Sequence, residues 1–237
     1  MNILIPMAGL GLRFKEAGYT MPKPLIPVNG KPMIQAAVES LGVDGNWIFV
    51  TRKFHDLKSR LEEIRPGCTV IELDFVTEGP ACTCLAARHL IDSDEPLLTA
   101  NVDQVMTWNG WAFSTAIKRL QHDGLIVTYT VHTPKNSYAT IDKKGFVTRI
   151  AEKEIISNWS LNGIHFWKHG SDFVRSAEQM IEKDLRVNGE FYIGPTYNEL
   201  IEEGKKIVLY HIPAGEHHAI GTPDDLKRYE DSQVTGL

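Results

Sequence analysis

Short apolar runs alternate with amphipathic segments along the first half of the chain. The runs have the length of strands that are buried on both faces, and the segments between them repeat their apolar positions at helical spacing. The expected strands are residues 2–7, 47–51, 70–73, 97–100 and 125–131, and the expected helices are 32–41, 56–64, 82–91 and 112–120. This alternation predicts an α/β fold with a doubly wound, mostly parallel sheet.

The pattern changes after about residue 132. Short strands are expected at residues 138–141, 147–150 and 163–167, with turn residues between them, so we expect a small hairpin-rich insertion laid over the sheet. Helices are expected again at 172–181, 197–203 and 223–229, and a strand at 207–212. Thr222 is the expected N-cap of the last helix, with Pro223 at its first position. We expect one domain over residues 1–237.

Composition and charge narrow the class of protein. The 237 residues are 43% hydrophobic and 23% charged, which is ordinary for a globular domain. A net charge of −5, from 25 basic and 30 acidic residues, argues against a nucleic-acid partner. No apolar run suits a membrane span, and the first residues lack the features of a signal peptide. Cys68, Cys82 and Cys84 are expected to be reduced thiols, so we expect a soluble cytoplasmic protein without a membrane partner.

A glycine-rich loop directly follows the first expected strand. Residues 7–14 read Met-Ala-Gly-Leu-Gly-Leu-Arg-Phe, and glycines allow consecutive backbone N–H groups to face an anion. A dinucleotide-binding fingerprint would need a third glycine where Phe14 stands and an acidic residue after the second strand, where residues 51–53 are Thr-Arg-Lys. The Gly-Lys-Ser/Thr of a P-loop is also absent. Another kind of phosphate site is therefore expected.

Two cations accompany this loop. Arg13 lies within it, and Lys23 follows in the sequence Pro-Lys-Pro-Leu at residues 22–25. The flanking prolines restrict the backbone around Lys23, which suits a lysine held in one direction better than a mobile surface charge. Two cations beside backbone donors suit a triphosphate.

Together these segments resemble the signature of a known family. Gly-x-Gly-x-Arg-Phe, a short spacer, Pro-Lys-Pro-Leu and then Val-Asn-Gly-Lys-Pro-Met-Ile at residues 28–34 are similar to the sugar-1-phosphate nucleotidyltransferases, or NDP-sugar pyrophosphorylases. They also resemble the related small-molecule cytidylyltransferases. Later segments match in the same order, so the resemblance covers nearly the whole chain. It implies a glycosyltransferase-A-like (Rossmann-like) fold, with residues 1–131 binding the nucleotide and residues 132–237 binding the acceptor.

The resemblance implies an enzyme that joins a nucleoside triphosphate to a small phosphorylated metabolite and releases pyrophosphate. A pyrimidine triphosphate, CTP or UTP/dTTP, is favoured, and the acceptor would be a phosphomonoester such as a sugar 1-phosphate. The product would serve surface or capsule polysaccharide biosynthesis. A homo-oligomer is compatible with the sequence, which identifies neither the base, the acceptor nor the oligomeric state.

The resemblance also assigns residues to the triphosphate and the metal. Ala8, Gly9 and Gly11 would bind the triphosphate, and Arg13 and Lys23 would be the catalytic cations, Lys23 bridging the α-phosphate and the acceptor. Asp103 ends the apolar strand before it, where ligands of open α/β sheets gather, and a hard carboxylate there suits Mg²⁺. Glu78 and Gly79, before the helix that follows the third strand, would read the base.

Acceptor residues and departures from the family pattern come from the second half. Glu152 and Lys153, from a segment like the family's Glu-Lys-Pro, would bind the acceptor and its phosphate, and Asn162 and Gly163 would line its pocket. Three positions depart from the pattern: Leu12 replaces a Thr or Ser, Glu154 replaces the proline, and Ala219 replaces an aspartate that binds the same metal. No second metal ligand can be named.

Three other functions stay open at this point. A cytidylyltransferase with a non-sugar phosphorylated acceptor is close to the first hypothesis, because Glu154 and Ala219 depart from the sugar-specific pattern. A glycosyltransferase of the same fold would normally have an Asp-x-Asp motif, whereas residues 101–103 are Asn-Val-Asp. A non-catalytic nucleotide-binding module would explain the missing second carboxylate, but not the presence of Lys23, Asp103 and Lys153 together.

Overall fold

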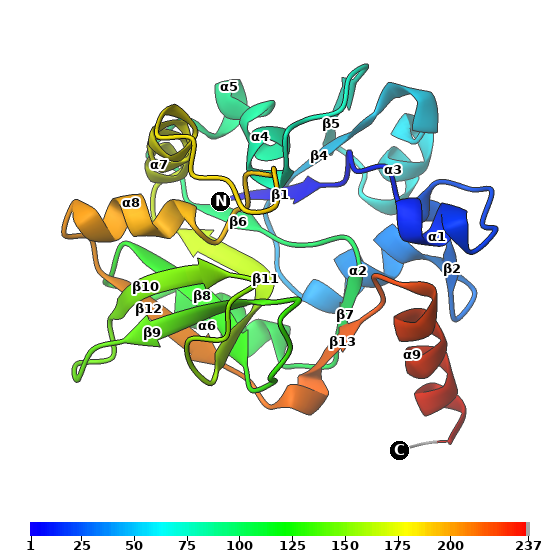
Figure 1. Ribbon diagram of the computed structural model, residues 1–237. Helices are drawn as coiled ribbons and strands as arrows, with labels where there is room; N and C mark the ends of the chain where they lie inside the picture. Colours follow the sequence, from blue (N-terminus) through cyan, green and yellow to red (C-terminus); the bar gives the residue numbers. More distant parts are fainter. Residues whose placement is uncertain (236–237) are drawn as a thin grey trace.

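The computed structural model of the protein describes residues 1–235, and a nine-stranded sheet runs through this part of the chain (Figure 1). Each strand is an apolar or alternating run that buries its side chains against helices. The strands are β1 (Asn2–Pro6), β4 (Asn46–Arg52), β5 (Thr69–Leu73), β6 (Leu97–Thr99), β8 (Gly124–Tyr129), β9 (Ser137–Ile141), β10 (Val147–Glu152), β11 (Trp159–Trp167) and β12 (Ile207–His211).

The sheet has a parallel half and a largely antiparallel half. Its order is β10-β9-β11-β6-β1-β4-β5, with β8 pairing with both β11 and β12. Strands β6, β1, β4 and β5 are parallel, whereas β11 is antiparallel to β6, β8 and β9. From β1 the chain first moves outward to β4 and β5 and then returns to β6 on the other side. Such a reversal of strand order is where open α/β sheets bind ligands.

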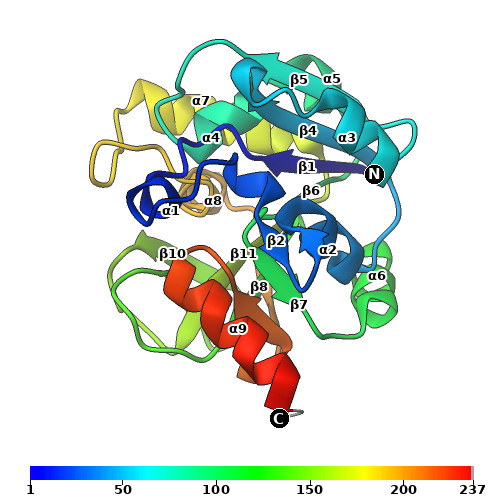
Figure 2. The same ribbon diagram turned by 90° about the vertical axis from the view of Figure 1, so that its right-hand side faces the viewer.

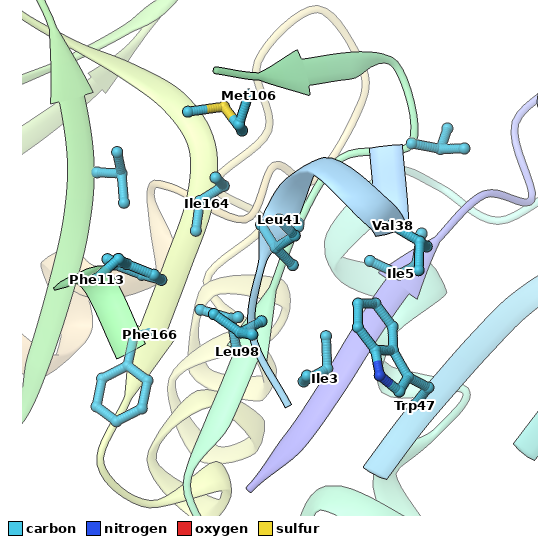
Figure 3. Close-up of a cluster of buried hydrophobic side chains, with 14 of the residues drawn as sticks. Ile3, Ile5, Val38, Leu41, Trp47, Leu98, Met106, Phe113, Ile164 and Phe166 are labelled. Atoms are coloured by element: carbon cyan, nitrogen blue, oxygen red, sulfur yellow. The ribbon is translucent and has the colours of Figure 1, made fainter. Parts of the chain in front are cut away.

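Helices cover both faces of the sheet, and side chains alternate between them. Ile3 and Ile5 of β1 join the core on one face, and Leu4 joins the core on the other. Figure 3 shows the first core, in which Ile5 lies near Val38 of α2 and Ile3 lies between Trp47 and Leu98. The helices on this face are α2 (Met33–Leu41), α3 (Lys58–Ile64) and α6 (Gly110–Lys118). Those on the opposite face are α4 (Pro80–Leu85), α5 (Arg88–Ile91), α7 (Gly170–Glu182) and α8 (Thr196–Glu202).

The remaining elements are short or lie at one end of the molecule. Helix α9 (Pro223–Thr235) lies at the lower front of the view in Figure 2, and its buried Leu226 packs in a cluster with Phe14, Val28 and Met33. Its expected N-cap is confirmed, since the Asp225 N–H donates to Thr222 Oγ1 over 3.1 Å. The others are α1 (Leu12–Glu16), the 3₁₀ turns η1 (Lys23–Leu25), η2 (Lys53–His55) and η3 (Ala214–Glu216), and the small pairs β2 (Pro27–Val28) with β3 (Lys31–Pro32) and β7 (Gln104–Met106) with β13 (His217–Ala219).

The predicted doubly wound α/β fold is confirmed, and two details of the prediction are wrong. The hairpin of β9 and β10 does not lie over the sheet; it extends the sheet, because β11 pairs with β9 at one end and with β6 at the other. The single helix expected at residues 82–91 is two helices, because i→i−3 bonds at Ala86 and Ala87 interrupt it. No helix within residues 1–235 combines the length and the apolar composition that crossing a bilayer requires.

Candidate active site

A cavity of approximately 470 Å³ opens at the carboxyl ends of β1 and β6. This size is typical of a site for a small ligand. Its walls come from the loop after β1, the segment after β6, the turn before α4 and the residues around η1. Of the residues chosen from the sequence, those that line it are Ala8, Gly9, Gly11, Arg13, Lys23, Gly79 and Asp103.

The loop after β1 offers free backbone donors to this cavity. Gly11 adopts a φ of +63° immediately before α1, and residues 7–11 belong to neither a helix nor a strand. Within residues 1–235, the N–H groups of residues 8–13 donate to no protein acceptor. Backbone donors that converge on a cavity form an anion site. Arg13 lines the same wall, and its side chain has no hydrogen bond or ion pair in the described residues.

Lys23 and Asp103 form an ion pair inside the cavity. The Lys23 Nζ lies 2.6 Å from Asp103 Oδ2, and the two side chains are 20% and 30% exposed. Lys23 begins η1 between Pro22 and Pro24, as the sequence led us to expect of a directed lysine. Asp103 follows β6 and precedes β7. Eighty residues apart in sequence, the two charged groups therefore meet where β1 and β6 end.

The Asp103 carboxylate is held between this lysine and a returning segment of the chain. Strand β13 pairs with β7, and the Ile220 N–H then donates to the Asp103 carbonyl over 2.9 Å. A Cβ at Gly221 would lie 2.7 Å from Asp103 Oδ2, so only glycine leaves room for the carboxylate. Burial raises the pKa of Asp103, but the charges of Lys23 and Arg13 outweigh it and lower the pKa. The carboxylate is therefore ionised at neutral pH.

The turn before α4 presents its backbone to the cavity and not the side chain of Glu78. Gly79 lines the cavity, and a Cβ there would lie 2.5 Å from the carbonyl oxygen of Phe191. The Phe191 N–H also donates to the Glu78 carbonyl over 2.8 Å. The Glu78 side chain is 63% exposed and pairs with Arg186 at 3.0 Å. Of the two base-reading candidates, the structure thus brings Gly79 into the cavity and leaves the Glu78 carboxylate outside it.

A chain of polar side chains connects the acceptor candidates to the cavity. Lys153 Nζ donates to Tyr192 Oη, and the Tyr192 hydroxyl donates to Glu190 Oε2 over 2.7 Å. Glu190 lines the cavity, whereas Glu152 and Lys153 do not. Ser137 donates to the Glu152 carboxylate, yet burial and the charge of Glu190 leave the pKa of Glu152 raised. Burial and the same Glu190 charge raise the pKa of Tyr192.

Asn162 and Gly163 lie behind the cavity wall. They form a β-bulge in β11, where the pairing with β8 shifts register between Leu161 and His165. Asn162 is only 4% exposed, and its Oδ1 accepts the N–H of Ile164. A Cβ at Gly163 would lie 2.1 Å from Nδ2 of Asn101, a residue that does line the cavity. The bulge thus supports Asn101 from behind.

Comparison with known proteins agrees with this geometry. Residues 3–142 match the family described as the MobA-like NTP transferase domain, which is more than half of the chain. The chain belongs to this NTP transferase family. It is 30% identical over 159 residues to a mannose-1-phosphate guanyltransferase of Emericella nidulans, covering 63% of this chain and 43% of that protein.

Two further proteins are similar to this NTP transferase over nearly its whole length. The low-salt glycan biosynthesis nucleotidyltransferase Agl11 of Haloferax volcanii is 25% identical over 95% of the chain and 64% of that protein. The chain thus spans less than two thirds of both sequence relatives. A nucleoside-diphosphate-sugar pyrophosphorylase structure from Vibrio cholerae RC9 shares the fold, with a TM-score of 0.84, 24% identity and coverage of 97% of this chain and 99% of that one.

The NTP transferase has one carboxylate at the position expected to bind a metal. Ala219 lies in β13 and contributes no carboxylate, and residues 1–235 contain no cluster of three His, Cys, Asp or Glu side chains suited to a metal. Asp103 is ionised and already binds a cation, the Lys23 ammonium. These residues fit Mg²⁺ if it takes its other ligands from phosphate oxygens and water, as Mg²⁺ commonly does.

Several residues around the cavity of the NTP transferase were given no role from the sequence. Asn101, Gly221, Glu190 and Tyr192 all contribute to it or to its supports, but they depend on contacts between distant segments. Gly221 stands two residues after Ala219, a position that the resemblance to the family singles out, so the sequence holds a signal for it. His217 of β13 contacts Gln104 and the Tyr129 ring, and burial lowers its pKa to about 4.

Proposed function

We propose that this NTP transferase joins a nucleoside triphosphate to a phosphomonoester, such as a sugar 1-phosphate, in a Mg²⁺-dependent reaction that releases pyrophosphate. One observation carries the proposal. A single cavity combines the free N–H groups of residues 8–13, the unpaired Arg13 and the Lys23–Asp103 pair. Free donors and cations that converge on one cavity suit a triphosphate, since its charge must be neutralised before its α-phosphorus can be attacked.

Arg13 and Lys23 would bind the triphosphate. Arg13 is free to bind phosphate oxygens, and the adjacent N–H groups bind others. Lys23 is fixed by Pro22 and Pro24 and would neutralise the α-phosphate as negative charge develops there. Asp103 would hold Mg²⁺, which when bound neutralises phosphate oxygens and favours the departure of pyrophosphate.

Lys153 would bind the acceptor. Tyr192 and Glu190 hold its ammonium towards the cavity, where it would bind the acceptor phosphate. An oxygen of that phosphate attacks the α-phosphorus, one P–O bond forms, and the bond to the β-phosphate oxygen breaks. The electron pair leaves with pyrophosphate. Because a phosphomonoester is already anionic, the step needs positioning and charge neutralisation and no general base.

The residues in and beside the walls of the cavity support a narrower proposal for the identity of the nucleobase and of the acceptor. Gly79 packs against the Phe191 backbone, and this tight wall favours a one-ring base, CTP or UTP/dTTP. The Glu154 side chain is 59% exposed and pairs with Arg149, so this departure from the family does not oppose a sugar 1-phosphate at Lys153. We further propose a cytoplasmic role in surface or capsule polysaccharide synthesis, which the named role of the Haloferax relative in glycan biosynthesis supports.

The test is release of pyrophosphate from CTP, UTP, dTTP, GTP and ATP with Mg²⁺ and a panel of acceptors. The panel combines sugar 1-phosphates with non-sugar phosphomonoesters, and GTP is essential because several relatives are named mannose-1-phosphate guanyltransferases. We expect acceptor-dependent release with one pyrimidine triphosphate and a sugar 1-phosphate. Omission of Mg²⁺ with excess chelator is expected to stop the reaction.

The other outcomes distinguish the remaining functions. Release with a non-sugar acceptor alone would indicate the cytidylyltransferase alternative. Hydrolysis or transfer from a sugar nucleotide, without use of any triphosphate, would indicate a glycosyltransferase. Tight triphosphate binding without release across the panel would contradict the proposed enzyme and favour a binding module.

A further inference from the structure

Asp103 has one cation partner in the free protein, and that partner is Lys23. Within the described residues no other side chain bonds to the Asp103 carboxylate. The two groups lie 2.6 Å apart and are more than two thirds shielded from solvent, so the pair is less screened than a surface ion pair. Together they carry no net charge.

The surroundings leave little freedom to either group. A Cβ at Gly221 would lie 2.7 Å from Asp103 Oδ2, and the same oxygen accepts the Lys23 ammonium over 2.6 Å. The Lys23 Cβ lies 3.2 Å from where a Cβ at Gly11 would be, and prolines flank the lysine. Lys23 therefore cannot move far without a new partner for its charge.

Within residues 1–235, this pair is not part of any cluster of three His, Cys, Asp or Glu side chains that could hold a divalent cation. Ala219 supplies no carboxylate, and the Glu190 carboxylate accepts the Tyr192 hydroxyl and lies beside the Lys153 network. A divalent cation approaching Asp103 would meet the Lys23 ammonium, and like charges at this distance repel strongly. The arrangement disfavours metal binding to the protein alone.

We propose that Asp103 is a single cation site that Lys23 fills in the free protein, and that Lys23 releases it only when a triphosphate arrives. This inference rests on the proposed function, since the triphosphate is the new partner of Lys23. Its phosphate oxygens draw the ammonium away, and the same event frees the Asp103 carboxylate. Metal and triphosphate then bind with positive coupling, and this coupling acts equally in both directions.

The test measures binding of Mn²⁺ alone to the whole chain, by calorimetry or by the loss of the free Mn²⁺ electron-spin-resonance signal. Wild type, Lys23→Met and Lys31→Met are compared. Lys31 is the matched control because it is an exposed lysine whose ammonium is also 2.6 Å from a carboxylate, that of Glu39. We expect Lys23→Met to bind Mn²⁺ at least about tenfold more tightly than wild type, and Lys31→Met to behave as wild type.

Two further variants make the result decisive. The double variant Lys23→Met/Asp103→Asn is expected to lose the higher Mn²⁺ affinity of Lys23→Met, and this loss would place the bound ion at Asp103. Lys23→Gln should repeat the gain if Lys23→Met unfolds, a possibility that circular dichroism checks. Equal Mn²⁺ affinity of wild type and both Lys23 variants would overturn the inference. Because the Mn²⁺ measurement involves no turnover, failure of this inference can be distinguished from failure of the proposed function.

Discussion

The two sides of the cavity are built in different ways. On the triphosphate side, one loop lines the cavity and the backbone N–H groups of residues 8–13 have no acceptor within residues 1–235; the chain places this loop by ending β1 and starting α1. On the acceptor side, Lys153 reaches the cavity only through Tyr192 and Glu190, from a segment almost forty residues later. Backbone donors tolerate changes in nearby side chains, whereas a side-chain network depends on every member. We therefore expect substitutions on the two sides to have effects of different size, and to affect the binding of different substrates.

The largest effect is expected for Lys23→Met. Lys23 is flanked by prolines and paired inside the cavity, and we propose that it neutralises the reacting phosphate. Loss of one pre-positioned group of this kind lowers kcat by about 10²–10³-fold. The rate of pyrophosphate release at saturating substrates measures it. Lys31→Met, which changes an exposed ion pair, should leave the rate within about twofold. Full activity of Lys23→Met would disprove its catalytic role.

Next in size is the effect expected of Gly79→Ala, a change in backbone and not in charge. The added Cβ would lie 2.5 Å from the Phe191 carbonyl oxygen, and Gly79 has a φ of +130°, so the turn before α4 must shift. A displacement of about 1 Å in a binding element can cost about 10²-fold in kcat/KM. The comparison is Glu78→Gln, whose side chain faces solvent and Arg186. It should change kcat/KM for the triphosphate less than about twofold, and a large effect would mean that Glu78 reads the base directly.

The same contrast explains what the sequence could predict. The parallel strands, the cap at Thr222 and the residues of the glycine loop follow from local patterns, and these predictions agree with the structure. The pairing of β7 with β13 has no such pattern, since each strand has three residues and the two are more than a hundred residues apart. It nevertheless brings Gly221 to Asp103. Likewise, nothing near Lys153 in sequence indicates that Tyr192 will bind it.

A smaller and more selective effect is expected for Tyr192→Phe. The substitution keeps the ring and removes the hydroxyl that accepts from Lys153 and donates to Glu190. Hydrogen bonds to charged groups contribute about 1.5–3 kcal/mol, so we expect KM for the acceptor to rise about tenfold or more. KM for the triphosphate should stay unchanged, because Tyr192 does not line the cavity. Equal changes in both KM values would contradict the division between the two sides.

The smallest expected effect concerns the joint between the two halves of the sheet. His165 of β11 stands opposite Thr99 of β6, where the antiparallel half meets the parallel half. It is 4% exposed, and burial lowers its pKa to about 3 from 6.5, so the folded protein holds it neutral. Between these values the unfolded chain binds the proton more readily. The contribution of the neutral His165 to the free energy of unfolding is therefore fully present above pH 6.5. It decreases as the pH falls below this value, by up to about 1.4 kcal/mol per pH unit. His165→Phe should make this slope shallower by the share that His165 contributes, as denaturant unfolding between pH 7 and pH 5 can measure. An unchanged slope would place the acid sensitivity elsewhere, with His217 as the next histidine to substitute, since its pKa of about 4 is also lowered by burial.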